Sequence, residues 1–145
     1  GASPNVTDSN GDYLILPAVK DNRTDLVRVL IRANATVNVR STETNASPLH
    51  YACENDNLEI ADELLSYGVL PDIKDKDGLW PLYIAAEHGN DEMITLLLNK
   101  GKANVKLKDS RLDHPLFLLV KQNKLEMVKL MLQLDAGNRV LYAQG

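Results

Sequence analysis

The chain has 145 residues, of which 44% are hydrophobic and 25% charged, a balance that allows a globular fold with a sizeable core. Its net charge is -4, which does not favour a nucleic-acid-binding protein with a broad basic face. One cysteine excludes an intramolecular disulfide and favours the cytoplasm or nucleus, and no apolar run reaches the roughly 18 to 20 residues of a membrane span.

Apolar residues recur along the chain at a spacing of 33 or 34 positions. Proline–leucine pairs begin at Pro48, Pro81 and Pro115. A second class of apolar pairs keeps the same step: Leu30-Ile31, Leu64-Leu65, Leu97-Leu98 and Met131-Leu132. A register that holds over four segments predicts a structure built from repeated units.

Each unit has the pattern of a short inner helix, a turn, a longer outer helix and a second turn. A proline suits the first turn of the inner helix, and small residues such as Ala52 and Ala85 let this helix approach its neighbours. The outer helix carries a single apolar stripe, which one short helix cannot bury alone, so the units are expected to stack. The expected units are 8–40, 42–74, 75–108 and 109–137, followed by a cap or tail at 138–145.

Gly, Asn or Asp stands at every expected turn, and these residues most readily adopt the left-handed conformation that ends a helix. The turns between the two helices fall at Asn22, Asp56, Gly89 and Asn123. The turns after the outer helices fall at Asn34, Gly68, Gly101 and Asp135.

These residues resemble the ankyrin repeat, whose motif is T-P-L-H-x-A. The second unit has Ser47-Pro48-Leu49-His50-Tyr51-Ala52, the third has Trp80-Pro81-Leu82-Tyr83-Ile84-Ala85, and the fourth has His114-Pro115-Leu116-Phe117-Leu118-Leu119. The resemblance covers nearly the whole chain. It implies an all-α solenoid of about four helix–turn–helix units, joined by β-hairpin-like fingers, that binds partners on its concave face.

Three features near the ends of the chain differ from the repeat pattern. Segment 1–7 resembles 34–40, the end of a repeat, so we expect a longer parent protein with at least one more repeat before residue 1. Pro17 lies three positions after the usual helix-starting proline and is expected to distort or shorten the first inner helix. Leu112 replaces the Gly or Asn found at this turn in the other units, so the last finger is expected to be irregular.

No catalytic, cofactor or metal site is predicted. His50 and Cys53 could form a base–nucleophile pair, but the resemblance places Cys53 at a packed position and His50 against Ser47 and the adjacent loop. The three histidines lie in different units without zinc-ligand spacing, and no phosphate-binding loop is present, so no small-molecule substrate is expected. Asn38 resembles hairpin asparagines that an asparaginyl hydroxylase can modify in this family; the alternative is an asparagine that holds its finger by local hydrogen bonds.

Trp80 and Tyr83 distinguish the third unit, because they replace the Ser/Thr and His of the motif beside an exposed Leu79. Aromatic residues are enriched at binding hot spots, although Trp80 could instead stack on His114 between units. Basic residues near the finger tips are expected to border acidic inner-helix ends. The expected partner-binding residues are Glu43, Tyr51, Glu54, Asn55, Lys76, Leu79, Trp80, Tyr83, Glu87, His88, Arg111 and Lys121.

The predicted fold and binding residues allow three functions. The first is a non-catalytic module that binds a peptide or partner domain, with no nucleic acid or membrane involved. The second is a histone-tail reader, in which Trp80, Tyr83 and Glu87 form a partial cage for methyl-lysine. The third is the regulatory or targeting arm of an enzyme located elsewhere in a longer chain.

Overall fold

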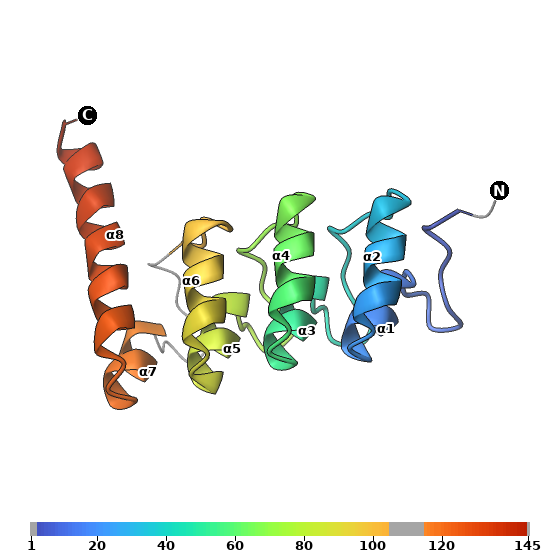
Figure 1. Ribbon diagram of the computed structural model, residues 1–145, viewed down its shortest axis with the longest axis horizontal. Helices are drawn as coiled ribbons and strands as arrows, with labels where there is room; N and C mark the ends of the chain where they lie inside the picture. The colour runs from blue at the N-terminus through green and yellow to red at the C-terminus, as the bar shows by residue number, and fades with distance from the viewer. Residues whose placement is uncertain (1–2, 105–114, 145) are drawn as a thin grey trace.

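The described residues form eight helices, α1 to α8, arranged as four pairs. The pairs stand side by side along one axis (Figure 1). The computed structural model describes residues 3–104 and 115–144, the segment 136–144 by its backbone alone. The inner helices are α1 (Ile15–Lys20), α3 (Pro48–Glu54), α5 (Pro81–His88) and α7 (Pro115–Lys121). The outer helices are α2 (Thr24–Arg32), α4 (Leu58–Ser66), α6 (Asp91–Asn99) and α8 (Leu125–Gln144).

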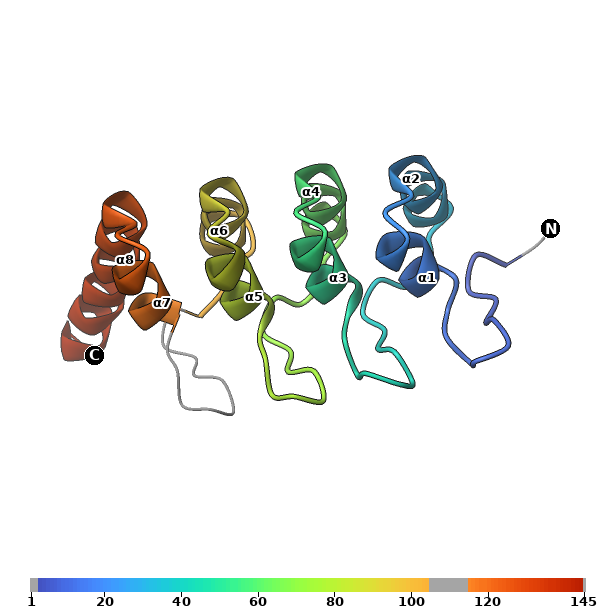
Figure 2. The same ribbon diagram turned by 90° about the horizontal axis from the view of Figure 1, so that it is seen from below.

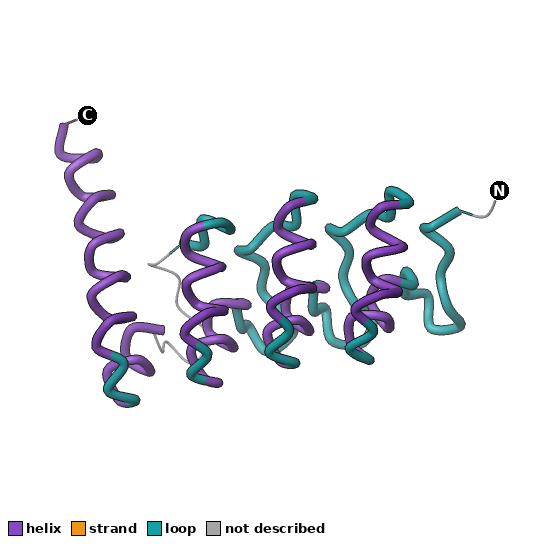
Figure 3. Tube along the Cα trace, in the orientation of Figure 1, coloured by secondary structure: helices purple, strands orange, loops and turns teal. Residues whose placement is uncertain are grey.

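The helices form two layers, and the loops that lead into α1, α3 and α5 project as fingers beside the inner layer (Figure 2). Within the described residues no segment forms a strand, so the expected all-α solenoid is confirmed (Figure 3). The fingers are held by turns. In the second finger, residues 40–47, Ser41 and Ala46 are joined by a backbone hydrogen bond of 2.9 Å.

Proline starts the inner helices α3 and α5, and asparagine caps the outer helices α4 and α6. Pro48 and Pro81 occupy the first turns of α3 and α5. The Asn57 side chain accepts a hydrogen bond from the backbone N–H of Ile60 at 3.0 Å, and Asn90 does the same for Met93 at 3.1 Å. These side chains satisfy N–H groups that the first turn of an outer helix leaves without an intrahelical partner.

The expected left-handed turns are confirmed at six of eight positions: Asn22, Asn34, Asp56, Gly68, Gly89 and Asn123. Two predictions were wrong. After α6 the positive φ belongs to Lys102, at 58°, and not to Gly101. Asp135 ends no helix, since α8 continues past it to Gln144.

The first inner helix is the shortest, with six residues, as expected from Pro17. Leu14 aligns with Pro48, the first residue of α3, but α1 begins one residue later, at Ile15. Pro17 therefore lies within the first turn of α1, where a missing N–H is harmless. Leu112 and its finger lie outside the described residues.

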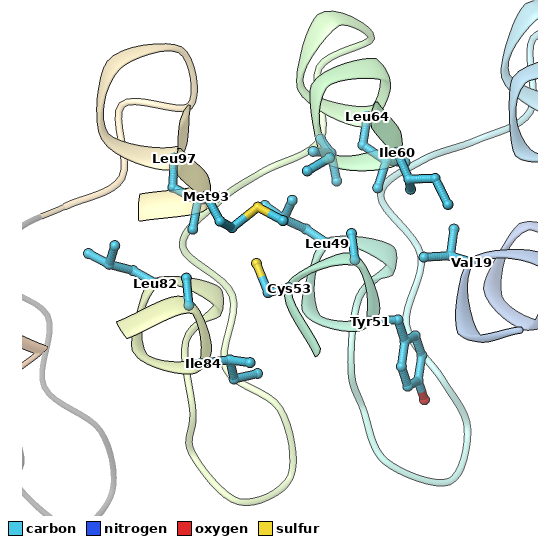
Figure 4. Close-up of a cluster of buried hydrophobic side chains, with 14 of the residues drawn as sticks. Val19, Leu49, Tyr51, Cys53, Ile60, Leu64, Leu82, Ile84, Met93 and Leu97 are labelled. Carbon is cyan, nitrogen blue, oxygen red and sulfur yellow. The ribbon is translucent and has the colours of Figure 1, made fainter. Parts of the chain in front are cut away.

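The core runs between successive helix pairs as one continuous cluster (Figure 4). Leu49 and Leu82 of the inner layer meet Ile60, Leu64 and Met93 of the outer layer, and each is at most 2% exposed. Full burial of such a side chain contributes about 1.5 to 3 kcal/mol. The apolar stripes therefore stabilise the stack as a whole, since each pair is buried by its neighbours.

Hydrogen bonds between the outer loops set the spacing of the pairs. Asn38 Oδ1 accepts from the Leu70 N–H at 2.8 Å, and Asn38 Nδ2 donates to the Gly68 carbonyl at 3.1 Å. Asn38 thus has the expected structural role, but its bonds reach the next unit, so the expectation that they are local was wrong. Asp72 makes the corresponding contact one unit later, accepting from the Asn104 N–H at 3.2 Å.

Candidate partner-binding face

The inner-helix face is defined here as the exposed side of α1, α3, α5 and α7 together with the fingers. Its predicted residues fall into four groups. Seven are exposed: Glu43, Glu54, Asn55, Lys76, Glu87, His88 and Lys121. Leu79 and Trp80 are half-buried, Tyr51 and Tyr83 are buried, and Arg111 lies outside the described residues.

The third finger, residues 74–80, is fixed by its own backbone and by the second finger. The Asp75 side chain accepts from the N–H groups of Asp77 and Leu79, at 2.9 and 3.0 Å. Gly78 takes a φ of 77°, which the tight turn requires and which costs glycine little. The Lys76 N–H donates to the Thr44 carbonyl at 2.8 Å, so neighbouring fingers are joined.

Trp80 leads from this finger into α5. The Lys74 ammonium lies 5.3 Å from the centre of the Trp80 ring, a cation–π distance. The alternative stacking partner, His114, lies outside the described residues. Trp80 is thus a half-buried aromatic residue with a basic neighbour, next to the half-buried Leu79.

Tyr83 is 2% exposed, so its ring offers no face to a partner. It occupies the position of His50, which is also fully buried. Sequence reasoning placed Tyr83 on the binding surface because tyrosine often lies at interfaces, but the third position of this inner helix faces into the stack. The structure therefore gives Tyr83 a packing role.

Tyr51 also has a structural role. Its hydroxyl lies 2.9 Å from Thr44 Oγ1, which fixes the second finger against α3, and the residue is only 7% exposed. The Lys20 ammonium lies 5.9 Å from the ring centre. The contact with Lys20 of the preceding helix pair was missed from the sequence.

His50 joins the second helix pair to the third finger. Its Nδ1 accepts from the Ser47 N–H at 3.0 Å, so Nε2 carries the proton and donates to the Leu79 carbonyl at 2.9 Å. Burial lowers the pKa of His50 and keeps the ring neutral. The expected contacts of His50 with Ser47 and the adjacent loop are confirmed.

Cys53 is fully buried on the same helix. Burial, together with Asp56 and Glu54, raises the pKa of the Cys53 thiol far above its usual range. A thiol held neutral in an apolar site is a poor nucleophile. The packed interpretation of Cys53 therefore holds, and the base–nucleophile pair does not.

The ends of the inner helices are used partly for contacts between units. Asn55 Nδ2 donates to the Val19 carbonyl at 3.0 Å, and Gln122 Nε2 donates to the Ala86 carbonyl at 2.7 Å. His88 Nδ1 lies 3.4 Å from Asp56 Oδ1. The sequence placed Gln122, like Asn55, at an exposed inner-helix end, and it did not predict that either amide bonds the preceding unit.

The two layers differ in how their charged residues are paired. On the outer layer, Arg28 and Arg32 form ion pairs with Glu59 and Glu63 of the next unit, at 2.9 and 3.2 Å. On the inner-helix face, the side chains of Glu43, Lys76 and Glu87 make no ion pair within the described part of the chain.

Glu54 lies near the middle of the inner-helix face. Burial is the largest cause that raises the pKa of its carboxyl, and Asp75 adds to this effect, while His88 and Lys20 oppose it. The face thus combines a partly desolvated carboxylate with the exposed Lys76 on the neighbouring finger.

Among residues 3–104 and 115–135, no group of three or more His, Cys, Asp or Glu side chains could hold a metal ion. Of the helices described, none has the length and apolar character needed to cross a membrane.

The stacked helix–turn–helix pairs with lateral fingers define the class as a helical repeat protein. The family described as "Ankyrin repeats (3 copies)" matches residues 1–75 and 68–140. The chain belongs to the ankyrin-repeat family, as the sequence motif indicated. Ankyrin repeats are generally protein–protein interaction modules and typically non-catalytic.

Three relatives illustrate the range of proteins that carry such repeats. An "Ankyrin repeat and KH domain-containing protein mask-1" of Caenorhabditis elegans is 32% identical over 91 residues, 63% of this chain. A "Putative ankyrin repeat protein L371" of Acanthamoeba polyphaga mimivirus is 32% identical over 135 residues, 89% of this chain. A "Putative palmitoyltransferase ZDHHC13" of Danio rerio is 31% identical over 101 residues, 70% of this chain. The matched regions cover only 4%, 17% and 16% of these relatives.

Proposed function

We propose that this chain is a non-catalytic interaction module that holds a peptide or partner domain on its concave face, across the second to fourth helix pairs. The observation that carries the proposal is the third finger, which presents Leu79, Trp80 and Lys76 from a backbone already fixed by hydrogen bonds. A surface that is ordered before binding loses little conformational entropy when a partner binds.

The chemistry of this face suits an extended peptide that carries both charges. Leu79 and Trp80 offer half-buried apolar surface, Lys76 offers a cation, and Glu54 and Glu87 offer exposed carboxylates. Lys76 and Glu87 are exposed, and within the described residues their side chains make no ion pair. Complementary charges would guide the peptide, while the apolar residues supply affinity.

The test compares Leu79→Ala with Val29→Ala, which lies 64% exposed on the outer helix α2. Partners captured by the wild-type chain are titrated against each variant by calorimetry, and circular dichroism checks that both variants keep the helical fold. Leu79→Ala is expected to weaken binding by about 1 to 3 kcal/mol, and Val29→Ala by less than about 0.5 kcal/mol. Equal affinity for both variants would refute the assignment of the face.

A methyl-lysine reader remains a second candidate because the Trp80 ring already lies near a cation, Lys74. With Tyr83 buried, such a cage would rest on Trp80 and Glu87, and the ligand would displace Lys74. Calorimetric titration with trimethylated and unmethylated lysine peptides of histone-tail sequence tests this candidate. Equal affinities would reject it, whereas a preference of about tenfold for the methylated peptide, lost in Trp80→Ala, would support it.

A third candidate is the arm of an enzyme in a longer chain, in the cytoplasm or the nucleus. The palmitoyltransferase relative favours it, since that name combines this kind of repeat with an enzyme. The sequence on both sides of these repeats in the parent protein would decide it: a recognisable catalytic domain supports the arm, and its absence from the complete parent rejects it.

A further inference from the structure

A shallow groove runs along the outer layer between α4 and α6, which stand side by side in the stack (Figure 1). Two half-buried leucines, Leu58 and Leu96, line this groove and pack against the core. Three exposed carboxylates complete the lining: Glu59, Asp62 and Glu92. The groove between α4 and α6 is therefore apolar at its floor and acidic at its rim.

The preceding outer helices, α2 and α4, hold an arginine at the equivalent place. The residues one unit before the groove lining are Thr24, Asp25, Arg28, Glu59 and Glu63. The Arg28 guanidinium lies 2.9 Å from the Glu59 carboxylate. It also lies 3.8 Å from the carboxylates of Asp25 and Glu63. One arginine side chain thus crosses from α2 to α4 and contacts three carboxylates.

Asp62 occupies the position of Arg28 in the groove between α4 and α6. The flanking carboxylates are kept, as Glu59 and Glu92, but the arginine between them is replaced by a third carboxylate. Lys100 Nζ lies 2.5 Å from Asp62 Oδ1, at the end of α6, and so balances one of these charges. Glu92 makes no ion pair within residues 3–104 and 115–135. The groove therefore keeps acceptors for a guanidinium that the chain does not itself supply there.

We propose that the groove between α4 and α6 docks a partner helix that presents an arginine beside an apolar side chain. The arginine lies between Glu59 and Glu92, as Arg28 lies among its own carboxylates, and the apolar side chain packs on Leu58 and Leu96. Neighbouring parallel helices leave a groove into which the side chains of a third helix can pack.

The charge of the groove decides against other kinds of occupant. Nucleic acids and anionic membrane surfaces require basic residues, whereas three carboxylates line this groove. The groove also lies on the layer opposite the fingers (Figure 2). Its partner helix is therefore separate from the peptide proposed for the inner-helix face, and neither proposal depends on the other.

The test pans a displayed library of helical peptides on the wild-type chain, after removal of peptides that also bind Glu92→Lys. The recovered peptides are expected to carry arginine and leucine on one helical face. One of them is then titrated by calorimetry against two further variants. Asp62→Arg, in which the chain supplies its own arginine to Glu92, should weaken binding at least about tenfold. The matched control Glu126→Arg makes the same change of charge on α8 and should weaken binding less than about threefold.

Three results would overturn the proposal. The first is a library that yields no peptide selective for wild type over Glu92→Lys, or yields only peptides without a cation. The second is a recovered peptide that binds Asp62→Arg as tightly as wild type, or that loses affinity in Leu79→Ala, since it then binds elsewhere. The third is self-association of the chain in sedimentation experiments that Glu92→Lys abolishes, because the occupant is then a second copy. Circular dichroism of each variant checks that the stack remains folded.

Discussion

His50 provides the strongest prediction about stability, since one buried side chain connects two units. Replacement by alanine removes the partner of the Ser47 N–H and of the Leu79 carbonyl, which lie 3.0 and 2.9 Å from the ring nitrogens. Each buried polar group left without a partner costs about 1 to 3 kcal/mol. The loss of unfolding free energy in His50→Ala is therefore expected to be about 3 kcal/mol at pH 7.5, measured by urea denaturation.

The pH dependence of the unfolding free energy distinguishes His50 from an apolar core residue. Burial lowers the pKa of His50, so the folded state favours the neutral ring, whereas the unfolded chain titrates near 6.5. The stability that neutral His50 contributes is complete above about pH 6.5 and declines as the pH falls towards the folded-state pKa. The stability advantage of wild type over His50→Gln should fall between pH 7.5 and 5.5, with a slope of at most about 1.4 kcal/mol per pH unit.

Other groups titrate in the same range, and the comparison with His50→Gln subtracts their contribution. Parallel stability curves for wild type and His50→Gln would show that protonation of His50 is not coupled to folding. A loss below about 1 kcal/mol in His50→Ala would refute the view that this side chain holds the third finger to the second helix pair.

Three further predictions follow from single side chains. Asn38→Ala should lower the unfolding free energy by about 1 to 2 kcal/mol in urea denaturation, because it removes both bonds to the next outer loop; a change below about 0.3 kcal/mol would contradict the spacing role. Burial raises the pKa of the Glu54 carboxyl, so the folded state disfavours its charged form. Glu54→Gln should therefore raise the unfolding free energy at pH 7 by less than about 1 kcal/mol. This gain should vanish below about pH 4, where the wild-type carboxyl is protonated. A gain that persists at pH 3 would argue against that cause. Iodoacetamide should alkylate Cys53 only as fast as the stack opens, with urea accelerating the reaction; rapid modification of the native chain would contradict its burial.

Turn residues carried most of the fold information, because left-handed backbone conformations restrict the residue type. Asn22, Asp56 and Gly89 identified their turns correctly from residue type and spacing alone. The error at Gly101 arose where the spacing gains one residue, and Lys102 adopts the positive φ instead. The repeat spacing locates a turn to within a residue or two, but it does not show which of these residues adopts the positive φ.

The candidate site was less predictable, because exposure depends on what the next unit covers. Trp80 and Tyr83 have the same sequence argument, yet only Trp80 remains partly accessible. Asn55 was expected to meet a partner, but its amide is engaged with the preceding helix pair. A single repeat pattern cannot distinguish polar residues that bind a partner from those that bind the neighbouring repeat, since both lie at the ends of inner helices.

The most direct measurement of the central claim is hydrogen exchange of the chain with and without a captured partner. Binding on the inner-helix face predicts slower exchange in the second and third fingers, residues 40–47 and 74–80, and in α3 and α5. The outer helices α2 and α4 should exchange as in the free chain. Protection confined to the outer helices, with the fingers unchanged, would contradict the account.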